Sequence, residues 1–241
     1  MILDILGSSL SIRNKIGLIL LMVPGLLIAL MVHEIAHGFI AWKLGDPTAK
    51  NLGRLSLNPV RHLDPVGTVM LFLIGFGWAK PVPVNSRNFK KPRRDIALTS
   101  LAGPVSNFLL ALCGGLVWGA LARFSPALEA EEITVWLVLL YGTQYFISIN
   151  IGLGLFNLIP IPPLDGSNIL ACLLPPTVAA KYLGIRKYTQ YIYLGLILLS
   201  ILSNRIELFS IIQMYLWYPL TWCRSMAATG IYRLVYLLFG I

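Results

Sequence analysis

Two histidines and a glutamate lie within five residues of one another in the segment MVHEIAHGFI at positions 31–40. On a helix, His33 and His37 share one face because they are four residues apart, so both imidazoles can reach the same ion. Zinc readily accepts histidine nitrogen as a ligand, and a hydrolytic zinc site keeps one position for water. Glu34, beside the first histidine, can accept a proton from that water. The H-E-x-x-H pattern therefore predicts zinc-dependent hydrolysis.

A zinc site of this kind needs a third protein ligand, and Asp165 is the candidate that the sequence favours. It follows NLIPIPPL and precedes GSNILACLL, and a lone carboxylate in such apolar surroundings is costly without a partner. A metal cation is a partner that would explain this carboxylate. Two alternatives stay open: Asp165 as the N-cap of a helix that begins at Gly166, and His62, in LNPVRHLDP, as the third ligand.

The composition indicates that the site belongs to a membrane protein. Of the 241 residues, 57% are hydrophobic and only 12% are charged, whereas soluble domains carry about 25% charged residues. The net charge is +9, and ten of the 19 lysines and arginines lie between Lys43 and Arg94. Such a basic segment is typical of a cytoplasmic loop near anionic lipid headgroups. We therefore expect the lipid bilayer, and no nucleic acid, as a partner.

Three apolar runs are long enough to form the membrane-spanning helices that must position these residues. They cover residues 16–42, which contain the histidines, 96–122 and 133–158. A proline-rich break and the L-D-G element follow at 159–174, and a short helix is expected over 167–174. The predicted fold is an all-α polytopic membrane protein with a three-helix catalytic core.

The loop between the first two spans, residues 43–95, contains two segments of special composition. Residues 66–79 are apolar but too short and too rich in glycine to span, which suits a re-entrant segment. In residues 79–89, apolar and polar residues alternate with prolines, which suggests short edge strands or an extended hairpin. We interpret Asn107, which follows Gly103 and Pro104, as a residue that hydrogen-bonds between helices.

Additional helices are expected in the C-terminal part, residues 190–240. Residues 190–203 and 207–222 predict a fourth and a fifth span or a tight helical pair, and residues 226–240 suit the membrane interface. The basic residues Lys181, Arg186 and Lys187 place the loop that follows Pro175 and Pro176 on the cytoplasmic side. The whole chain, residues 1–241, is predicted to form a single membrane domain.

The motifs, taken together, resemble those of the site-2 proteases, the membrane-embedded zinc metalloproteases. H-E-I-A-H at the end of one membrane helix and FNLIPIPPLDG on a later one carry the resemblance. Three further stretches are similar to those of the compact bacterial members, which have neither a PDZ-like insertion nor a nucleotide-sensing domain. They are GRLSLNPVRHLDPVGT at 53–68, FGWAKPVPVN at 76–85 and AGPVSN at 102–107.

The resemblance, which covers residues 15–175, implies one zinc ion held between the first and third core helices. His33 and His37 match the histidine ligands of the family, and Asp165 matches the carboxylate ligand. Glu34 matches the general base, and Asn157 matches an asparagine that steadies the substrate carbonyl or its oxyanion. Residues 65–90 resemble a membrane-associated β-loop that binds substrate as an added strand.

The sequence therefore predicts an intramembrane zinc metalloprotease that cuts membrane-protein substrates in or near their transmembrane segments, as in regulated intramembrane proteolysis. We expect it in the bacterial cytoplasmic membrane, with its active site open toward the cytoplasm. The alternatives are a membrane metal transporter and a non-catalytic membrane adaptor that contains zinc. A transport path usually needs several ligand sets along its length, and a closed site has no use for Glu34, so the sequence favours hydrolysis.

Overall fold

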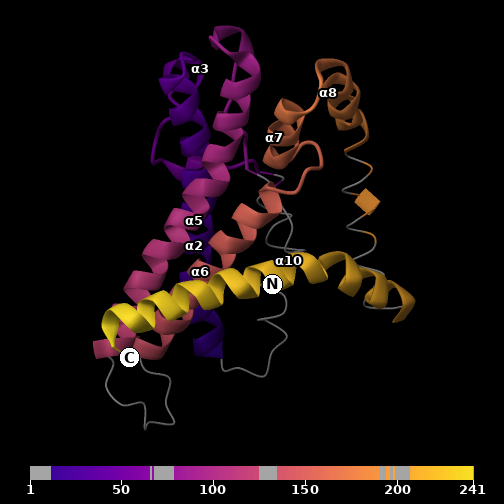
Figure 1. Ribbon diagram of the computed structural model, residues 1–241. Helices are drawn as coiled ribbons and strands as arrows, with labels where there is room; N and C mark the ends of the chain where they lie inside the picture. The colour runs from indigo at the N-terminus through magenta and orange to yellow at the C-terminus, as the bar shows by residue number, and fades with distance from the viewer. Residues whose placement is uncertain are drawn as a thin grey trace.

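The computed structural model describes residues 12–65, 67, 79–124, 135–189 and 207–240, together with residues 191, 194, 195 and 198. Within these ranges three helices are long and apolar enough to cross a membrane. They are α2 (Ile12–Lys43), α5 (Pro92–Phe124) and α6 (Val135–Asn157). The three helices pack against one another in a bundle (Figure 1), which confirms the predicted all-α polytopic fold.

Helix α5 begins earlier than the sequence predicted, at Pro92 instead of residue 96. A proline at the first helical position is pre-organised for the helix and lacks only an N–H that would have no partner there. Asp95 in the first turn accepts a hydrogen bond from the Lys91 N–H at 2.9 Å. The basic run KKPRRD is therefore partly the first turn of this helix.

Small residues on α5 allow the core helices to approach closely, as is common between membrane helices. A Cβ atom added to Gly114 would lie 2.9 Å from the ring of Phe146 and 3.1 Å from the side chain of Ile147, both on α6. Beside this contact, Ala111, Ile147 and Ile151 are fully buried. This core fixes α5, which carries Asn107, against α6, which carries Asn157.

The prolines after α6 end that helix as predicted, and the chain then forms three short helical segments. They are α7 (Asp165–Leu173), α8 (Pro176–Leu183) and the 3-10 segment η3 (Gly184–Tyr188). Helix α7 begins two residues before the predicted range. The basic segment at 181–187, which we predicted as a loop, is helical because Pro176 starts a new helix at its first position.

The predicted break near residues 222–226 is wrong, because α10 (Glu207–Phe239) is one continuous helix. The segment Thr221–Ala228 contains no glycine or proline that would end a helix. Figure 1 shows α10 in yellow lying across the core helices, toward the end of the molecule opposite α3 (Thr48–Asn51). The predicted span at 190–203 lies largely outside the described residues.

The loop between α2 and α5 contains an extended segment, residues 79–85, which we call the strap. A single antiparallel bridge joins Leu63 to Ala79, and the 3-10 segment η2 (Ser86–Asn88) follows the strap. The predicted edge strands do not form in the described part of the loop, since Pro81 and Pro83 have no N–H to continue a ladder. The predicted re-entrant segment at 66–79 falls almost wholly outside the described residues.

Candidate metal centre and active site

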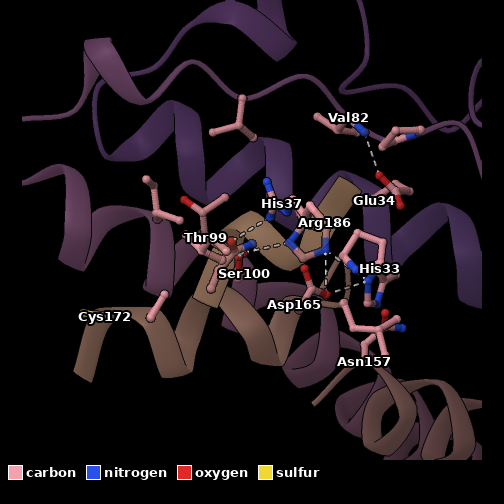
Figure 2. Close-up of a pocket in the computed structure, with 18 of the residues that line it drawn as sticks. His33, Glu34, His37, Val82, Thr99, Ser100, Asn157, Asp165, Cys172 and Arg186 are labelled. Atoms are coloured by element: carbon pink, nitrogen blue, oxygen red, sulfur yellow. Dashed lines mark hydrogen bonds and ion pairs between the residues drawn. The ribbon is translucent and has the colours of Figure 1, made fainter. Parts of the chain in front are cut away.

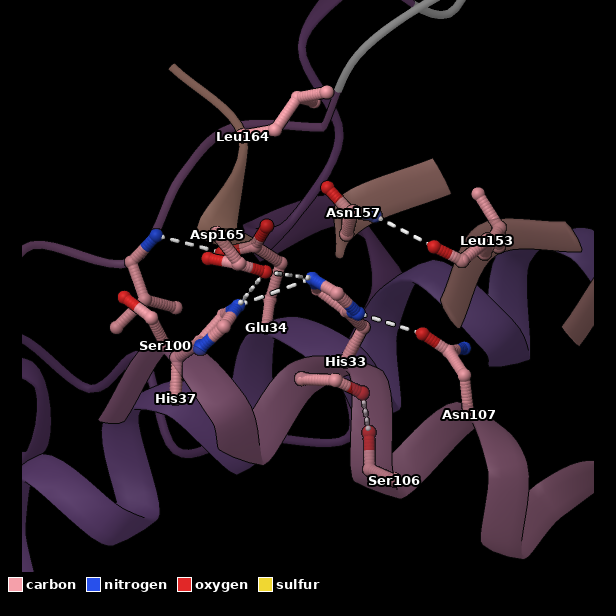
Figure 3. Close-up of polar contacts among 12 residues, drawn as sticks. His33, Glu34, His37, Ser100, Ser106, Asn107, Leu153, Asn157, Leu164 and Asp165 are labelled. Carbon is pink, nitrogen blue, oxygen red and sulfur yellow. Dashed lines mark hydrogen bonds and ion pairs between the residues drawn. The ribbon is translucent and has the colours of Figure 1, made fainter. Parts of the chain in front are cut away.

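His33 and His37 on α2 and Asp165 on α7 point toward one another (Figure 3). The Nε2 atom of each histidine lies 3.2 Å from Oδ2 of Asp165, and the two Nε2 atoms are 3.0 Å apart. Ligands of a tetrahedral zinc ion, each about 2.0–2.2 Å from the metal, are separated by about 3.3 Å. The described residues thus contain a group of three side chains that can hold one metal ion.

The outer nitrogen of each imidazole is held by helix α5, and its partner decides which nitrogen carries the proton. Nδ1 of His37 lies 2.7 Å from the backbone carbonyl of Thr99, which can only accept. Nδ1 of His33 lies 2.6 Å from Oδ1 of Asn107. The Asn107 amide is oriented by donating to Asn150 Oδ1 at 3.0 Å, so its oxygen faces His33. Both Nε2 atoms therefore carry the lone pair and face Asp165.

This arrangement fits a metal cation. Asp165 Oδ2 is buried and has no hydrogen-bond donor among the described residues. With each Nδ1 protonated, two nitrogen lone pairs and a carboxylate oxygen converge on one point, and three acceptors cannot satisfy one another. A divalent cation at that point would satisfy all three atoms.

Two sequence alternatives for the third ligand are wrong. Asp165 is the first residue of α7 rather than its N-cap, which is Leu164, and no side chain in the described part of the chain caps this helix. His62 lies outside the metal group: it is 2% exposed, and its Nε2 donates to the carbonyl of Ser56 at 2.8 Å. His62 instead stabilises the loop, since its own carbonyl accepts the N–H of Lys80 at 2.8 Å.

Two glycines in the motifs AGPVSN and LDG allow the helices to meet at the site. A Cβ atom on Gly103 would lie 2.5 Å from Nε2 of His37 and 2.6 Å from Cε1 of His33. A Cβ atom on Gly166 would lie 2.5 Å from the carbonyl carbon of Leu158, in the backbone that follows α6. Glycine is therefore required where α5 meets the histidines and where α7 begins.

Helix α7, which carries Asp165, is tied to α5 by polar contacts at its far end. Arg93 donates to the carbonyls of Ala171 at 3.2 Å and Cys172 at 2.9 Å, and also to that of Leu174. These are carbonyls that the end of a helix leaves without partners. Asn168 adds a hydrogen bond to Ser100 Oγ at 2.8 Å. The carboxylate ligand thus sits on a short helix that is fixed to α5 at residue 168 and at its far end.

Asn107 is a functional residue whose role the sequence did not reveal. It is fully buried, and it does bridge helices, as predicted, by donating to Ala29 O at 3.3 Å and to Asn150. Its contact with His33 was missed because the two residues are 74 positions apart. The available signal was an asparagine four residues after Gly103, on the same helical face, within an apolar run.

We expect the substitution Asn107→Leu to weaken zinc binding about 10- to 100-fold, the usual effect of losing a residue that orients a metal ligand. Leucine has nearly the same volume but leaves Nδ1 of His33 without an acceptor. Competition with a chelator would measure the zinc dissociation constant. Ser106→Ala is the matched control, since the Ser106 hydroxyl donates to Gly103 O of its own helix at 2.7 Å and, within the described ranges, to no metal ligand. Equal affinity in both variants would contradict the assigned role.

Glu34 points toward the strap rather than toward the other acidic residue of the site (Figure 2). Its Oε2 accepts the backbone N–H of Val82 at 2.8 Å. The strap is also anchored on either side of this contact. Arg54 donates to the carbonyls of Lys80 at 2.5 Å and Pro81 at 3.2 Å, and Asp46 accepts the N–H of Asn85 at 2.6 Å.

Asp46 joins the strap to the end of α2 through hydrogen bonds. The carboxylate is fully buried and accepts the backbone N–H and the hydroxyl of Thr48, the side-chain amide of Asn88 and the N–H of Asn85. Burial alone would raise the pKa of Asp46, but the hydrogen bonds from Thr48, Asn88 and Asn85 outweigh burial and hold this pKa below its ordinary value.

We expect the substitution Asp46→Asn to lower the free energy of unfolding by about 2 kcal/mol at neutral pH, since it removes charge-assisted hydrogen bonds. Because the folded pKa is depressed, the carboxylate stabilises the fold fully above its unfolded pKa of about 3.9, and this stabilisation is lost as the pH falls through the folded pKa. Thermal unfolding in detergent from pH 7 to pH 3 would measure this. The difference between the variant and the parent should shrink at the acid end; a constant difference would contradict the expectation.

The metal ligands and Glu34 open into one cavity of about 1200 Å³. Val82 and Val84 of the strap line this cavity, as do Leu164 and Asn157. Asn157, the last residue of α6, donates from Nδ2 to Leu153 O at 3.0 Å, as Figure 3 shows. The structure thus brings together all five site residues that the sequence predicted.

Comparison with known proteins agrees with this site. The sequence profile described as Peptidase family M50 matches residues 127–202. YwhC of Bacillus subtilis, whose name describes a zinc metalloprotease, is 45% identical to this chain over 179 residues, covering 71% of this chain and 77% of YwhC. The chain belongs to peptidase family M50. This is the family of the site-2 proteases, so the resemblance that the motifs indicated is confirmed.

Mycobacterial members of the family are also similar. Rip2 of Mycobacterium tuberculosis H37Rv is 30% identical over 78% of this chain and 70% of Rip2. Rip2 of Mycolicibacterium smegmatis is 27% identical over 80% of this chain and 71% of Rip2. Both are named as zinc metalloproteases. No solved structure gives a significant match.

Because the chain belongs to this family, it is a membrane protein and a zinc metalloendopeptidase. An enzyme of this class uses zinc, and His33, His37 and Asp165 form the group that can bind one ion. The chain is therefore an enzyme, rather than the metal transporter or the non-catalytic adaptor that the composition and motifs left as alternatives.

Proposed function

We propose that this metalloprotease cuts peptide bonds in or near the transmembrane segments of membrane-protein substrates. The depth of the site carries the proposal. His37 and His33 lie six and ten residues before Lys43, the last residue of α2, which places them about 9 and 15 Å from that end of the helix. Since the hydrocarbon core of a bilayer is about 30 Å thick, a site at this depth reaches bonds that are buried in lipid.

Three residues would hold the metal in the proposed reaction, and a fourth would transfer the proton. His33, His37 and Asp165 would hold zinc, which when bound supplies a Lewis acid that polarises the scissile carbonyl and lowers the pKa of water toward neutrality. Glu34 would take the proton from the attacking water and deliver it to the leaving amine. The Nδ1 contacts with Asn107 and Thr99 keep both imidazoles in the required orientation during this transfer.

Asn157 is proposed to stabilise the developing oxyanion. Its amide nitrogen has two N–H groups, and only one is needed for the bond to Leu153 O. The second N–H can donate to an oxygen in the cavity that Asn157 lines. A pre-positioned donor of this kind acts where negative charge develops in the transition state.

We further propose that the site opens toward the cytoplasm of a bacterial cell. The ten lysines and arginines from Lys43 to Arg94 lie at the end of α2, in the loop that follows it and in the first turn of α5. These are the ends of the two helices nearest the metal group. Basic residues at the ends of spans favour the cytoplasmic side. In this orientation water would reach the cavity from the cytoplasm.

The extent of the catalytic core, residues 15–175 within one membrane domain, stays a prediction.

The backbone of the substrate must become extended before it is cut, because a membrane helix has its carbonyls in internal hydrogen bonds. Pairing along the strap, which lines the cavity at Val82 and Val84, would compensate for the bonds that unwinding breaks. Substrates whose spans contain helix-weakening residues should therefore be favoured.

A panel of single-span fusion proteins would test this function. The purified enzyme would be reconstituted in liposomes with substrates whose spans are either leucine-rich or carry a central Gly-Pro pair, and the products would be mapped by mass spectrometry. We expect cuts within the span and faster cleavage of the Gly-Pro series. Cuts confined to the soluble tails, at equal rates in both series, would refute an intramembrane site.

A further inference from the structure

The strap offers few hydrogen-bond donors to an added strand. Pro81 and Pro83 have no N–H, the N–H of Lys80 is bonded to His62 O at 2.8 Å, and that of Asn85 is bonded to Asp46. Val82 and Val84 therefore supply the two donors in the middle of the strap. The first of these is held by Oε2 of Glu34 at 2.8 Å, so the donor nearest the site is bonded to the proposed base.

The strap is fixed independently of this one contact. Arg54 holds the carbonyls of Lys80 and Pro81 on one side, and Asp46 holds Asn85 on the other. Val82 is 8% exposed, and its side chain packs on Gly38 of α2, where an added Cβ atom would lie 3.0 Å from Val82 Cγ1. The bond between Val82 and Glu34 can therefore exchange while the strap stays in place.

We propose that the Val82 N–H is a shared donor, which Glu34 holds in the empty site and which a substrate carbonyl takes over when the substrate pairs with the strap. The exchange removes the N–H that fixes Oε2 of Glu34, so the carboxylate gains an accepting site and can turn toward the attacking water when a peptide lies along the strap. Substrate binding and availability of the base are thereby coupled through one backbone amide. This inference rests on the proposed function, since it needs a substrate that binds in extended form.

Hydrogen exchange can follow this amide by itself, because the flanking prolines leave Val82 as the only exchangeable backbone amide in residues 81–83. Glu34→Gln keeps an oxygen that accepts the Val82 N–H, whereas Glu34→Ala removes it. Both variants lack the base, so a bound substrate stays uncut. Without substrate, we expect the Val82 amide to be protected in Glu34→Gln and to exchange faster in Glu34→Ala, with equal zinc content. Addition of a single-span fusion substrate should restore protection in Glu34→Ala.

Substrate affinity provides the second measurement. A substrate must displace the side chain at position 34 in Glu34→Gln but not in Glu34→Ala, so we expect Glu34→Ala to bind the same substrate about threefold to tenfold more tightly, the value of one hydrogen bond. In the Val82→Pro background no N–H is available, and the two variants should bind equally. If Glu34→Gln and Glu34→Ala bind the substrate equally well while Val82 is unchanged, the Val82 N–H is not a shared donor. Failure of both variants to bind any substrate would instead contradict the proposed function together with this inference.

Discussion

Replacing Glu34 by glutamine is expected to abolish cleavage while the enzyme keeps its zinc. Glutamine has the shape of glutamate and can still accept the Val82 N–H, so the strap and the metal group should keep their positions. The amide cannot take a proton from water, and the loss of a general base typically lowers the rate about 10²- to 10⁴-fold. Cleavage of a single-span fusion substrate and zinc content by mass spectrometry would be measured on the same preparation.

Ser86→Ala is a suitable control for this experiment, because Ser86 also lines the cavity and carries no carboxylate. It should cleave at nearly the parent rate. If Glu34→Gln cleaves as fast as the parent with zinc bound, the proton acceptor is another group. If zinc is lost, the substitution has disturbed the metal ligands, and the reduced rate says nothing about proton transfer.

The substitution Gly166→Ala is expected to remove zinc and activity together, although alanine is nearly as small and favours helices. The added Cβ would lie 2.5 Å from the carbonyl carbon of Leu158 and 2.7 Å from the carbonyl oxygen of Ile159. These are backbone atoms, so the start of α7 must move instead. Asp165 is the preceding residue, and displacement of a ligand by about 1 Å is enough to disrupt a metal site.

Gly152→Ala is the matched control, since a Cβ atom at this position of α6 meets no atom of the described residues within 4 Å. We expect Gly152→Ala to retain full zinc content and activity, and Gly166→Ala to lose at least about 10²-fold in cleavage. Circular dichroism would show that both variants remain helical. Stoichiometric zinc in Gly166→Ala would mean that α7 tolerates the shift without moving its carboxylate.

Features that depend on the spacing of residues close together in the chain could be predicted from the sequence. The four-residue interval between His33 and His37 placed both on one face of a helix, and apolar length predicted the three core helices to within a few residues at most ends. Asp165 was predicted as a ligand because burying a carboxylate within apolar sequence costs free energy unless the carboxylate has a partner.

Features that depend on packing between distant segments could not be predicted. The bond from His33 to Asn107 joins residues on two helices, and no periodicity marks such a pair. The reason for Gly166 lies in a backbone carbonyl of another segment. His62, which the sequence left open as a third ligand, is instead buried in the loop, where the turn of the chain brings its partners Ser56 and Lys80 to it.

The C-terminal helix has a consequence for how the enzyme meets other membrane proteins. Gly115 and Gly119 on α5 form a small-xxx-small face of the kind by which membrane helices commonly dimerise. Here that face is already covered, because Ile231 and Val235 of α10 lie where side chains at these glycines would be. Helix α10 therefore occupies the position that a partner helix would take. Neither a second copy nor a substrate helix can dock on the two glycines without first displacing α10.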